Sequence, residues 1–148
     1  MDLDQRGEWN MSTIRDTALQ FIRDVEAGKG WAVCRQYCHP DATFLSQTEY
    51  FGGIDTVEGY AEATRGSFRA FPDYGGDVRS CGVDDQRRHV IVCGRSWGTH
   101  TGEGGPVPPT GKRFEIDAVG VMEFDGDLIR HLTVVVDGAS FAQQLGWA

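Results

Sequence analysis

The first half of the chain has the hydrophobic spacing of helices, in which apolar residues recur every three or four positions. Helices are predicted over residues 14–25, 31–37 and 55–71. Gly28 is expected to end the first of them, and the segment 42–46 is expected to be extended. The chain up to Pro72 is therefore predicted to be mostly helical.

The second half alternates apolar and polar residues with the period of two that is typical of strands. Strands are predicted over residues 77–83, 88–101, 113–124 and 128–136, followed by a short closing helix over 139–145. The glycine- and proline-rich segment 102–112 is predicted to be a loop. Helices followed by a run of antiparallel strands indicate the α+β class, with the helices packed on one face of the sheet.

The dipeptide Asp125-Gly126 is the strongest hairpin signal in the chain, because it favours the positive φ angles of a two-residue turn. Such a turn pairs Phe124 with Asp127, and the same register is expected further out. One face of the hairpin then consists of Phe114, Ile116, Ala118, Gly120, Met122, Ile129, His131, Thr133, Val135 and Asp137. An apolar face with a few polar groups is typical of a ligand pocket. The opposite face mixes charges with valines and suits either solvent or a dimer interface.

Two polar side chains on the predicted pocket face are candidates for proton transfer. Burial raises the pKa of a carboxyl such as Asp137 and lowers that of an imidazole such as His131, which brings both toward neutral pH. Each has a structural alternative, because Asp137 stands where an aspartate caps the closing helix, and His131 can be a hydrogen-bonded core histidine. His100, at the end of a predicted strand, is the third catalytic candidate, with an exposed loop-side position as its alternative.

A pocket on this sheet also needs an apolar lining. The residues expected to contact a substrate are Phe114, Ile116, Gly120, Met122, Thr133, Tyr60, Phe68 and Trp97. Trp97 lies on the strand predicted over 88–101, and the pattern leaves open which face of this strand is inside. For most of the aromatic residues the alternative is an ordinary hydrophobic core.

Composition and charge exclude several classes of protein. The 148 residues are 40% hydrophobic with a net charge of −8 and no basic stripe, so we expect a folded domain that binds no nucleic acid. Residues 1–11 are expected to form an N-terminal arm without signal-peptide character, ahead of one domain over 12–148. No segment approaches the roughly 20 apolar residues of a membrane span. The prediction is a cytoplasmic protein whose partner is a small hydrophobic molecule, with no membrane contact.

The cysteines argue against disulfides and metal. They are Cys34, Cys38, Cys81 and Cys93, and no two of them form a C-x-x-C pair. Without a secretory signal, reduced thiols are expected. The spacing does not suit a zinc site.

Four short segments of the chain are similar to one known family. They are GTHTGE at 98–103, PPTGK at 108–112, FDGDLI at 124–129 and QQLG at 143–146. Through them the chain, over residues 12–147, resembles the SnoaL-like polyketide cyclases of the nuclear transport factor 2-like superfamily. The resemblance implies a cone-shaped, curved antiparallel sheet wrapped over the N-terminal helices, an internal pocket and a homodimer. It also implies ring closure by aldol condensation without cofactor or metal, with Asp137 as general acid/base and His100 as the histidine of the GTH motif.

The chain departs from this family pattern at two points. Leu132 stands where the family often has tryptophan, and the stretch from Gly126 to Asp137 is one residue longer than usual. A β-bulge in this stretch would reverse the facing of every residue beyond it. Two functions are compatible with these observations. One is a cyclase or related lyase or isomerase that acts on a hydrophobic carbonyl compound, and the other is a non-catalytic binding protein of the same fold.

Overall fold

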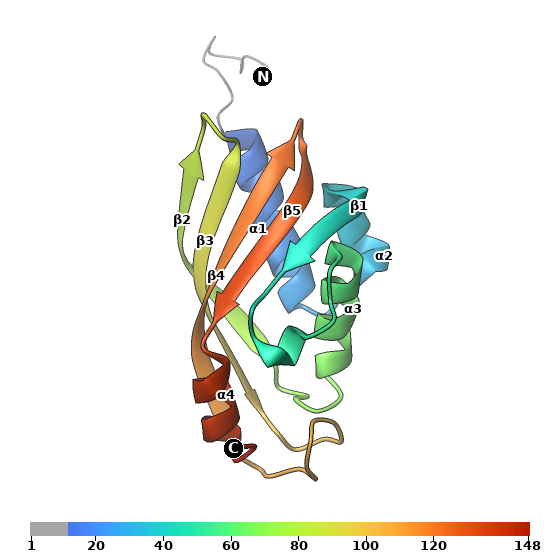
Figure 1. Ribbon diagram of the computed structural model, residues 1–148, viewed down its shortest axis with the longest axis vertical. Coiled ribbons are helices and arrows are strands. Elements are labelled where there is room, and N and C mark those ends of the chain that lie inside the picture. Colours follow the sequence, from blue (N-terminus) through green and yellow to red (C-terminus); the bar gives the residue numbers. More distant parts are fainter. Residues whose placement is uncertain (1–11) are drawn as a thin grey trace.

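The computed structural model (Figure 1) describes residues 12–148, and the arm predicted over residues 1–11 lies outside the described residues. The helices are α1 (Ser12–Glu26), α2 (Trp31–Cys34), α3 (Val57–Ser67) and α4 (Gly138–Leu145), and two 3-10 turns are η1 (Arg35–Tyr37) and η2 (Glu49–Phe51). The strands are β1 (Cys38–Leu45), β2 (Gly75–Asp84), β3 (His89–Thr99), β4 (Arg113–Asp125) and β5 (Leu128–Val136). Within residues 12–148, no helix has the length and apolar character that crossing a bilayer requires.

The five strands form one open, curved sheet in the order β1-β5-β4-β3-β2. The pairs from β2 to β5 are antiparallel, as predicted, whereas β1 pairs with β5 in parallel, so the sheet is mixed. α1 crosses one face of the sheet and α3 lies beside β1, while α4 follows the end of β5 (Figure 1). Helices packed on one face of a sheet confirm the α+β class.

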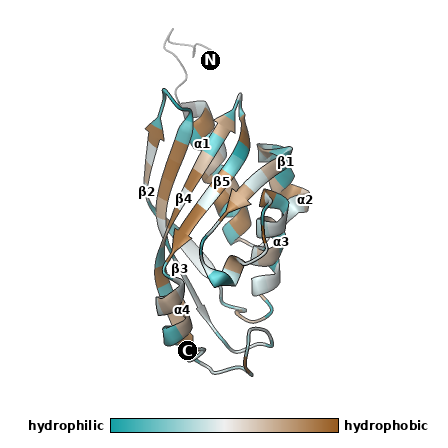
Figure 2. Ribbon diagram, in the orientation of Figure 1, coloured by the Kyte–Doolittle hydropathy of each residue, from teal (hydrophilic) through white to brown (hydrophobic). Residues whose placement is uncertain are grey.

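The main hydrophobic core lies between α1 and the sheet. Phe21 and Val25 on α1 pack with Met122 and Leu132 on the sheet, and all four side chains are almost completely buried. Burial of each such side chain contributes about 1.5–3 kcal/mol to stability. Figure 2 shows apolar residues along β3, β4 and β5 and hydrophilic residues at the hairpin turns. Met122, a predicted substrate contact, is therefore a core residue.

The turn between β4 and β5 lies one residue later than predicted. Asp125 pairs with Leu128, so the two-residue turn is Gly126-Asp127, and Gly126 takes a φ of 62°. The positive φ falls on the first turn position, where glycine has no Cβ to clash. The later turn moves each pairing partner by two residues, and this alone leaves the facing of the side chains unchanged.

A β-bulge at Arg130 then changes the facing. Phe124 pairs with Ile129, whereas the neighbouring Glu123 pairs with His131, so β5 has one extra residue there. The longer stretch in the sequence predicted this possibility, and beyond the bulge the facing is reversed. The inner face receives Leu132, Val134 and Val136, while the residues on the outer side are His131, Thr133, Val135 and Asp137. The predicted pocket face is thus correct for β4 and wrong for β5 beyond Ile129.

Candidate active site

A cavity of about 470 Å³ separates the end of α1 from the sheet. Its sheet wall includes five small residues on three adjacent strands, namely Gly76, Gly94, Ser96, Ala118 and Gly120. Strand pairing brings them side by side, because Ser96 is the partner of Gly76 and Ala118 is the partner of Gly94. Small side chains leave a space that α1 and the sheet do not fill. This settles the inner face of β3, which carries Gly94 and Ser96.

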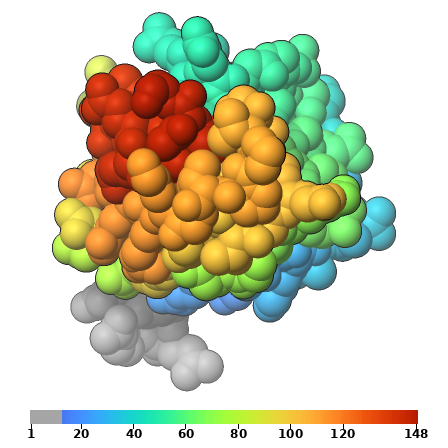
Figure 3. All heavy atoms as spheres, turned by 90° about the horizontal axis from the view of Figure 1, so that it is seen from below, coloured from blue at the N-terminus to red at the C-terminus, as the bar shows by residue number. Residues whose placement is uncertain are grey.

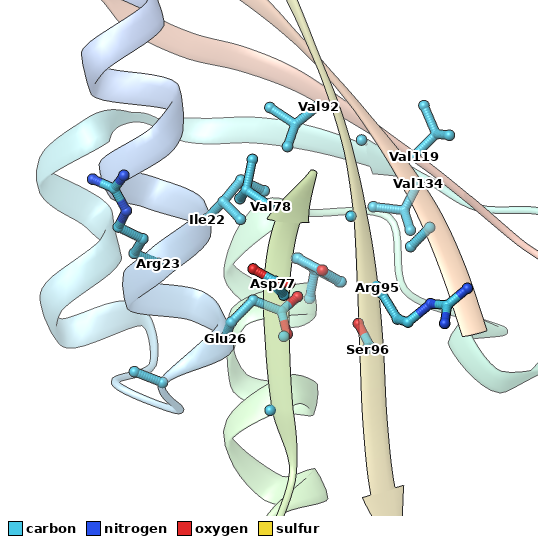
Figure 4. Close-up of a pocket in the computed structure, with 17 residues that line it drawn as sticks. Ile22, Arg23, Glu26, Asp77, Val78, Val92, Arg95, Ser96, Val119 and Val134 are labelled. Carbon is cyan, nitrogen blue, oxygen red and sulfur yellow. The ribbon is translucent and has the colours of Figure 1, made fainter. Parts of the chain in front are cut away.

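Glu26, the last residue of α1, extends into this cavity toward β2 and β3, as Figure 4 shows. Its Oε2 atom is enclosed and has no hydrogen-bond partner in the part of the chain that the structure describes. Burial raises the pKa of the Glu26 carboxyl, and a hydrogen bond from Tyr74 opposes that rise. A buried carboxyl with a free oxygen and a raised pKa is a candidate general acid/base.

Hydroxyl groups surround the Glu26 carboxyl. The Tyr74 hydroxyl interacts with both Glu26 and Ser96, and burial, followed by the Glu26 charge, holds the pKa of Tyr74 well above its ordinary value. Tyr74 therefore remains a protonated hydrogen-bond donor at neutral pH. Burial likewise raises the pKa of Tyr60, whose ring stacks on Phe44 at a centroid distance of 4.8 Å. A substrate oxygen beside Glu26 and Tyr74 would meet a neutral hydroxyl donor, although Arg23, Asp77 and Arg95 also line the cavity.

The end of α1 is held by a second carboxylate. Asp24 is buried, and its Oδ2 accepts a hydrogen bond from the Tyr37 hydroxyl at 2.6 Å while its Oδ1 accepts one from Lys29 Nζ at 3.0 Å. Positions two apart lie on opposite sides of a helix. Anchoring Asp24 to the residues after the helix therefore turns Glu26 toward the sheet. Gly28, with a φ of 72°, lies two residues after Glu26 and prevents the helix from continuing.

The cavity continues into a narrow chamber of about 60 Å³. The residues shared by the two are Glu26, Tyr60, Ser96, Ala118 and Val134. The aromatic residues of the chamber wall are Tyr50, Phe51, Tyr60, Phe71, Tyr74, Phe114 and Phe141. Among residues 12–148, Glu26 is the only charged residue that lines it. An apolar wall around one carboxyl suits a hydrophobic ligand with a reactive polar group.

The structure brings together four of the predicted substrate contacts and separates the other four. Gly120 and Tyr60 line the cavity, and Tyr60, Phe114 and Ile116 line the chamber. Met122 is in the core, and Phe68 packs on Gly28 and Tyr74. Thr133 and Trp97 are on the outer face, where Thr133 lines an open groove and neither residue lines the cavity or the chamber. Trp97 faces outward because the inner positions of β3 alternate with it.

Asp137 is the N-cap of α4. Its side chain is exposed, and Oδ1 accepts a hydrogen bond from the backbone N–H of Ser140 at 3.0 Å. It lines an open groove outside the chamber and does not line the cavity that contains Glu26.

We expect Asp137→Ala to lower the free energy of unfolding by about 1 kcal/mol, because the helix loses its cap. Asp137→Asn keeps a side-chain oxygen that accepts the hydrogen bond from Ser140. Its free energy of unfolding should lie within about 0.5 kcal/mol of that of the parent protein. Urea unfolding monitored by circular dichroism measures both. Equal stability of the alanine variant and the parent would contradict the capping role.

His131 and His100 also lie outside the cavity. On the outer face, His131 Nδ1 is 2.6 Å from Thr43 Oγ1, which connects β5 to β1. His100 has no exposed surface, and its Nε2 donates a hydrogen bond to the Gly104 carbonyl at 2.8 Å. His100 Nδ1 accepts a hydrogen bond from Trp147 Nε1 at 3.1 Å. His100 thus ties the 102–112 loop to the C-terminus, and Figure 3 shows these two segments side by side.

Glu26 is the residue that the sequence reasoning missed. It continues a row of apolar residues spaced four apart, Ile14, Ala18 and Ile22, and therefore lies on the buried face of α1. A carboxylate on an apolar helix face is rare without a partner or a function. That position was the available signal.

Within residues 12–148, neither the cysteines nor a cluster of metal-ligating side chains forms a second site. All four cysteines are free, and burial raises the pKa of Cys34 to about 11 and that of Cys38 to about 12. Both thiols are therefore poor nucleophiles at neutral pH. No group of three or more histidine, cysteine or carboxylate side chains within residues 12–148 is arranged to hold a metal ion.

Comparisons with known proteins agree with this architecture. The model of the family described as SnoaL-like polyketide cyclase matches residues 16–145. No curated protein sequence matches the chain. Similar folds occur in AclR, a candidate hydroxylase from Streptomyces galilaeus (TM-score 0.75, 19% identity, 94% of this chain and 88% of that chain), and in a candidate SnoaL-like polyketide cyclase from Jannaschia sp. CCS1 (TM-score 0.77, 16% identity, 93% and 94%). A candidate polyketide cyclase from Acidithiobacillus ferrooxidans has a TM-score of 0.75 and 26% identity, covering 94% of this chain and 98% of that chain.

Proposed function

Because the chain belongs to the SnoaL-like polyketide cyclase family, we propose that it is a cofactor-independent cyclase, or a related lyase or isomerase, that enolises a hydrophobic carbonyl compound beside Glu26. One observation carries this proposal. The Glu26 Oε2 atom is enclosed and unpartnered inside a largely apolar cavity. A buried carboxyl is costly unless something compensates for it. A substrate proton is the partner that this oxygen lacks.

The proposed reaction is a proton transfer followed by an aldol addition. The Glu26 carboxylate takes a proton from the carbon next to a carbonyl, and the C–H electron pair forms an enolate. Once Glu26 is protonated, the Tyr74 hydroxyl turns its single O–H from that carboxyl to the enolate oxygen, which accepts the hydrogen bond. The enolate carbon then attacks a second carbonyl carbon of the same molecule, a C–C bond forms, and the new alkoxide receives the proton from Glu26. A carboxyl with a raised pKa suits both directions of this transfer.

In this proposal Glu26 has the role that the family resemblance gave to Asp137. The exposure of Asp137 and its hydrogen bond to Ser140 support the exchange of roles. His131 and His100 are assigned no proton transfer, because hydrogen bonds to other parts of the chain already engage both rings.

The test is deuterium exchange at an acidic carbon. Ethyl naphthoylacetate, an aromatic β-keto ester, is incubated with the protein in deuterium oxide at pH about 6, and mass spectrometry follows the label. We expect exchange to accelerate in proportion to protein concentration. Binding of the ester by equilibrium dialysis, with no accelerated exchange, would indicate a non-catalytic binding protein instead.

Gly76→Ala is expected to disable proton transfer with little effect on stability. A Cβ at this position would lie 2.6 Å from Glu26 Oε2, so the carboxyl has to move. The carboxyl is the end of a flexible side chain, and the expected cost in unfolding free energy is under about 1 kcal/mol. Displacement by about 1 Å should reduce the exchange rate by about a hundredfold.

The matched control is Gly82→Ala on the same strand, where an added Cβ meets nothing within 4 Å. This variant should catalyse deuterium exchange into the ester at the rate of the parent protein. If Gly76→Ala also catalysed exchange at that rate, the position of Glu26 would not matter for the reaction.

A further inference from the structure

An open groove lies on the other side of the chamber from the main cavity. It has a volume of about 1050 Å³ and is bounded by the segment from β1 to η2, the end of β5, α4 and the C-terminus. Its walls include Leu45, Tyr50, Val135, Pro106 and Trp147. The groove is therefore formed by segments that are far apart in the sequence, and it is wider than the chamber behind it.

Most of the exposed large apolar side chains within residues 12–148 line the groove, together with the acidic residues Glu49 and Asp137. Among residues 12–148, the large hydrophobic side chains that remain exposed are Leu45 at 52%, Tyr50 at 41%, Val107 at 37% and Val135 at 59%. Three of these line the groove, and Val107 follows Pro106, which lines it as well. Contiguous exposed apolar surface marks a binding site more often than scattered residues do. The groove also contains Ser46, whose buried hydroxyl has no hydrogen-bond partner within the described chain.

The groove is continuous with the chamber that contains Glu26. Six residues line both, namely Thr48, Tyr50, Val134, Val136, Gly138 and Phe141. Tyr50 and Phe141 lie at the junction with ring centroids 4.9 Å apart, and the Tyr50 hydroxyl is 2.8 Å from Ser67 Oγ. The chamber of about 60 Å³ is thus a narrow passage between spaces of about 470 and 1050 Å³.

We propose that the groove is the outer half of the substrate site and that the substrate carries a long, flexible apolar chain. The reacting carbonyl lies beside Glu26, and the chain passes Val136 into the groove. This inference rests on the proposed function for the position of the carbonyl. The narrow passage favours a single alkyl or acyl chain over a second fused ring system. Within the part of the chain that the structure describes, no charged residue other than Glu26 lines the passage, which suits an apolar chain.

Two esters with the same reacting head test this inference. Ethyl and octyl naphthoylacetate differ only in the length of the alcohol chain, and equilibrium dialysis gives the dissociation constant of each. We expect the parent protein to bind the octyl ester at least about tenfold more tightly, because the added methylenes are buried. Val136→Phe fills the passage and should reduce this ratio to under about threefold, mainly by weakening the binding of the octyl ester. An equal ratio in the parent and in Val136→Phe would overturn the inference.

Val121→Phe is the matched control, because Val121 lies on the outer face of β4, faces Thr133 and lines neither the cavities nor the groove. It should keep the ratio of the parent protein. A measurement on the parent protein tests the inference even if Val136→Phe does not fold. The octyl ester, and not the ethyl ester, should shift the methyl NMR signals of Leu45 and Val135. Unshifted signals, or a dimer in sedimentation that excludes the octyl ester from the groove, would contradict the inference.

The groove and the proposed function can fail separately. If the parent protein shows the octyl preference and the methyl shifts but catalyses no deuterium exchange, the proposed function is wrong and the groove assignment stands. If exchange occurs and the chain length has no effect on binding, the groove assignment is wrong and the proposed function stands.

Discussion

Glu26→Gln is expected to slow deuterium exchange into ethyl naphthoylacetate by about 10²–10⁴-fold, the usual contribution of a general acid/base. Glutamine has nearly the shape of glutamate, so the cavity keeps its form, but its amide cannot accept the proton. The dissociation constant of the ester should change by less than about threefold, because the rest of the apolar wall is unchanged. Mass spectrometry and equilibrium dialysis measure the two quantities on the same samples.

Glu58→Gln is the control for this substitution. Glu58 is an exposed residue in the first turn of α3 and lines neither the cavity nor the chamber. It should exchange deuterium at the parental rate. If Glu26→Gln and Glu58→Gln behave alike, another group moves the proton, and the assignment of Glu26 is lost.

Glu26→Gln should also change how the free energy of unfolding depends on pH. Burial raises the pKa of Glu26 in the folded protein above its ordinary value of 4.5. As pH rises through that value, the unfolded chain loses its proton first, the folded chain holds more protons, and the free energy of unfolding falls. This loss of stability is complete above the pKa of Glu26 in the folded protein. It amounts to about 1.4 kcal/mol for each unit by which folding raises that pKa. Glu26→Gln lacks this term, so its stability advantage over the parent protein should grow from pH about 4 to neutral pH.

The fold could be predicted well because its signals are local and repeated. The helical spacing before Pro72 and the period-two pattern after it gave the elements, and Asp125-Gly126 located the hairpin to within one residue. The parallel pairing of β1 with β5 was not predictable in this way, because no local pattern states which edge a lone strand joins. Register was the weakest point, since one extra residue at Arg130 reversed a whole strand face.

The candidate site was harder because two distant segments create it. Gly76 looks like an ordinary strand glycine in the sequence, and only strand pairing sets it against Ser96 and under the Glu26 carboxyl. Glu26 looks like the polar end of a helix until its place on the row of Ile22 is noticed. The family pattern directed attention to Asp137, which in this chain follows a bulge and caps a helix instead.

His100→Ala is expected to lower the free energy of unfolding by about 3 kcal/mol or more. The substitution opens a cavity in a fully buried position and leaves the Gly104 carbonyl and the Trp147 indole N–H without their partner. Trp147→Phe removes one of these hydrogen bonds and keeps an aromatic ring against Phe71, so it should cost less than His100→Ala. Urea unfolding gives both values, and His39→Ala, at a partly exposed histidine, should cost under about 1 kcal/mol.

His100→Ala also distinguishes a structural role of this histidine from a catalytic one. At a temperature where His100→Ala remains folded, its rate of deuterium exchange should stay within about threefold of the parental rate, because His100 lines neither the cavity nor the chamber. A catalytic histidine would give the opposite result, with exchange reduced by about 10²-fold or more and stability nearly intact. Trp147→Phe adds a second comparison, because the loss of one hydrogen bond to His100 should lower stability and leave the rate of deuterium exchange unchanged. A large loss of exchange in His100→Ala would therefore return this residue to the reaction and weaken the assignment of the proton transfer to Glu26 alone.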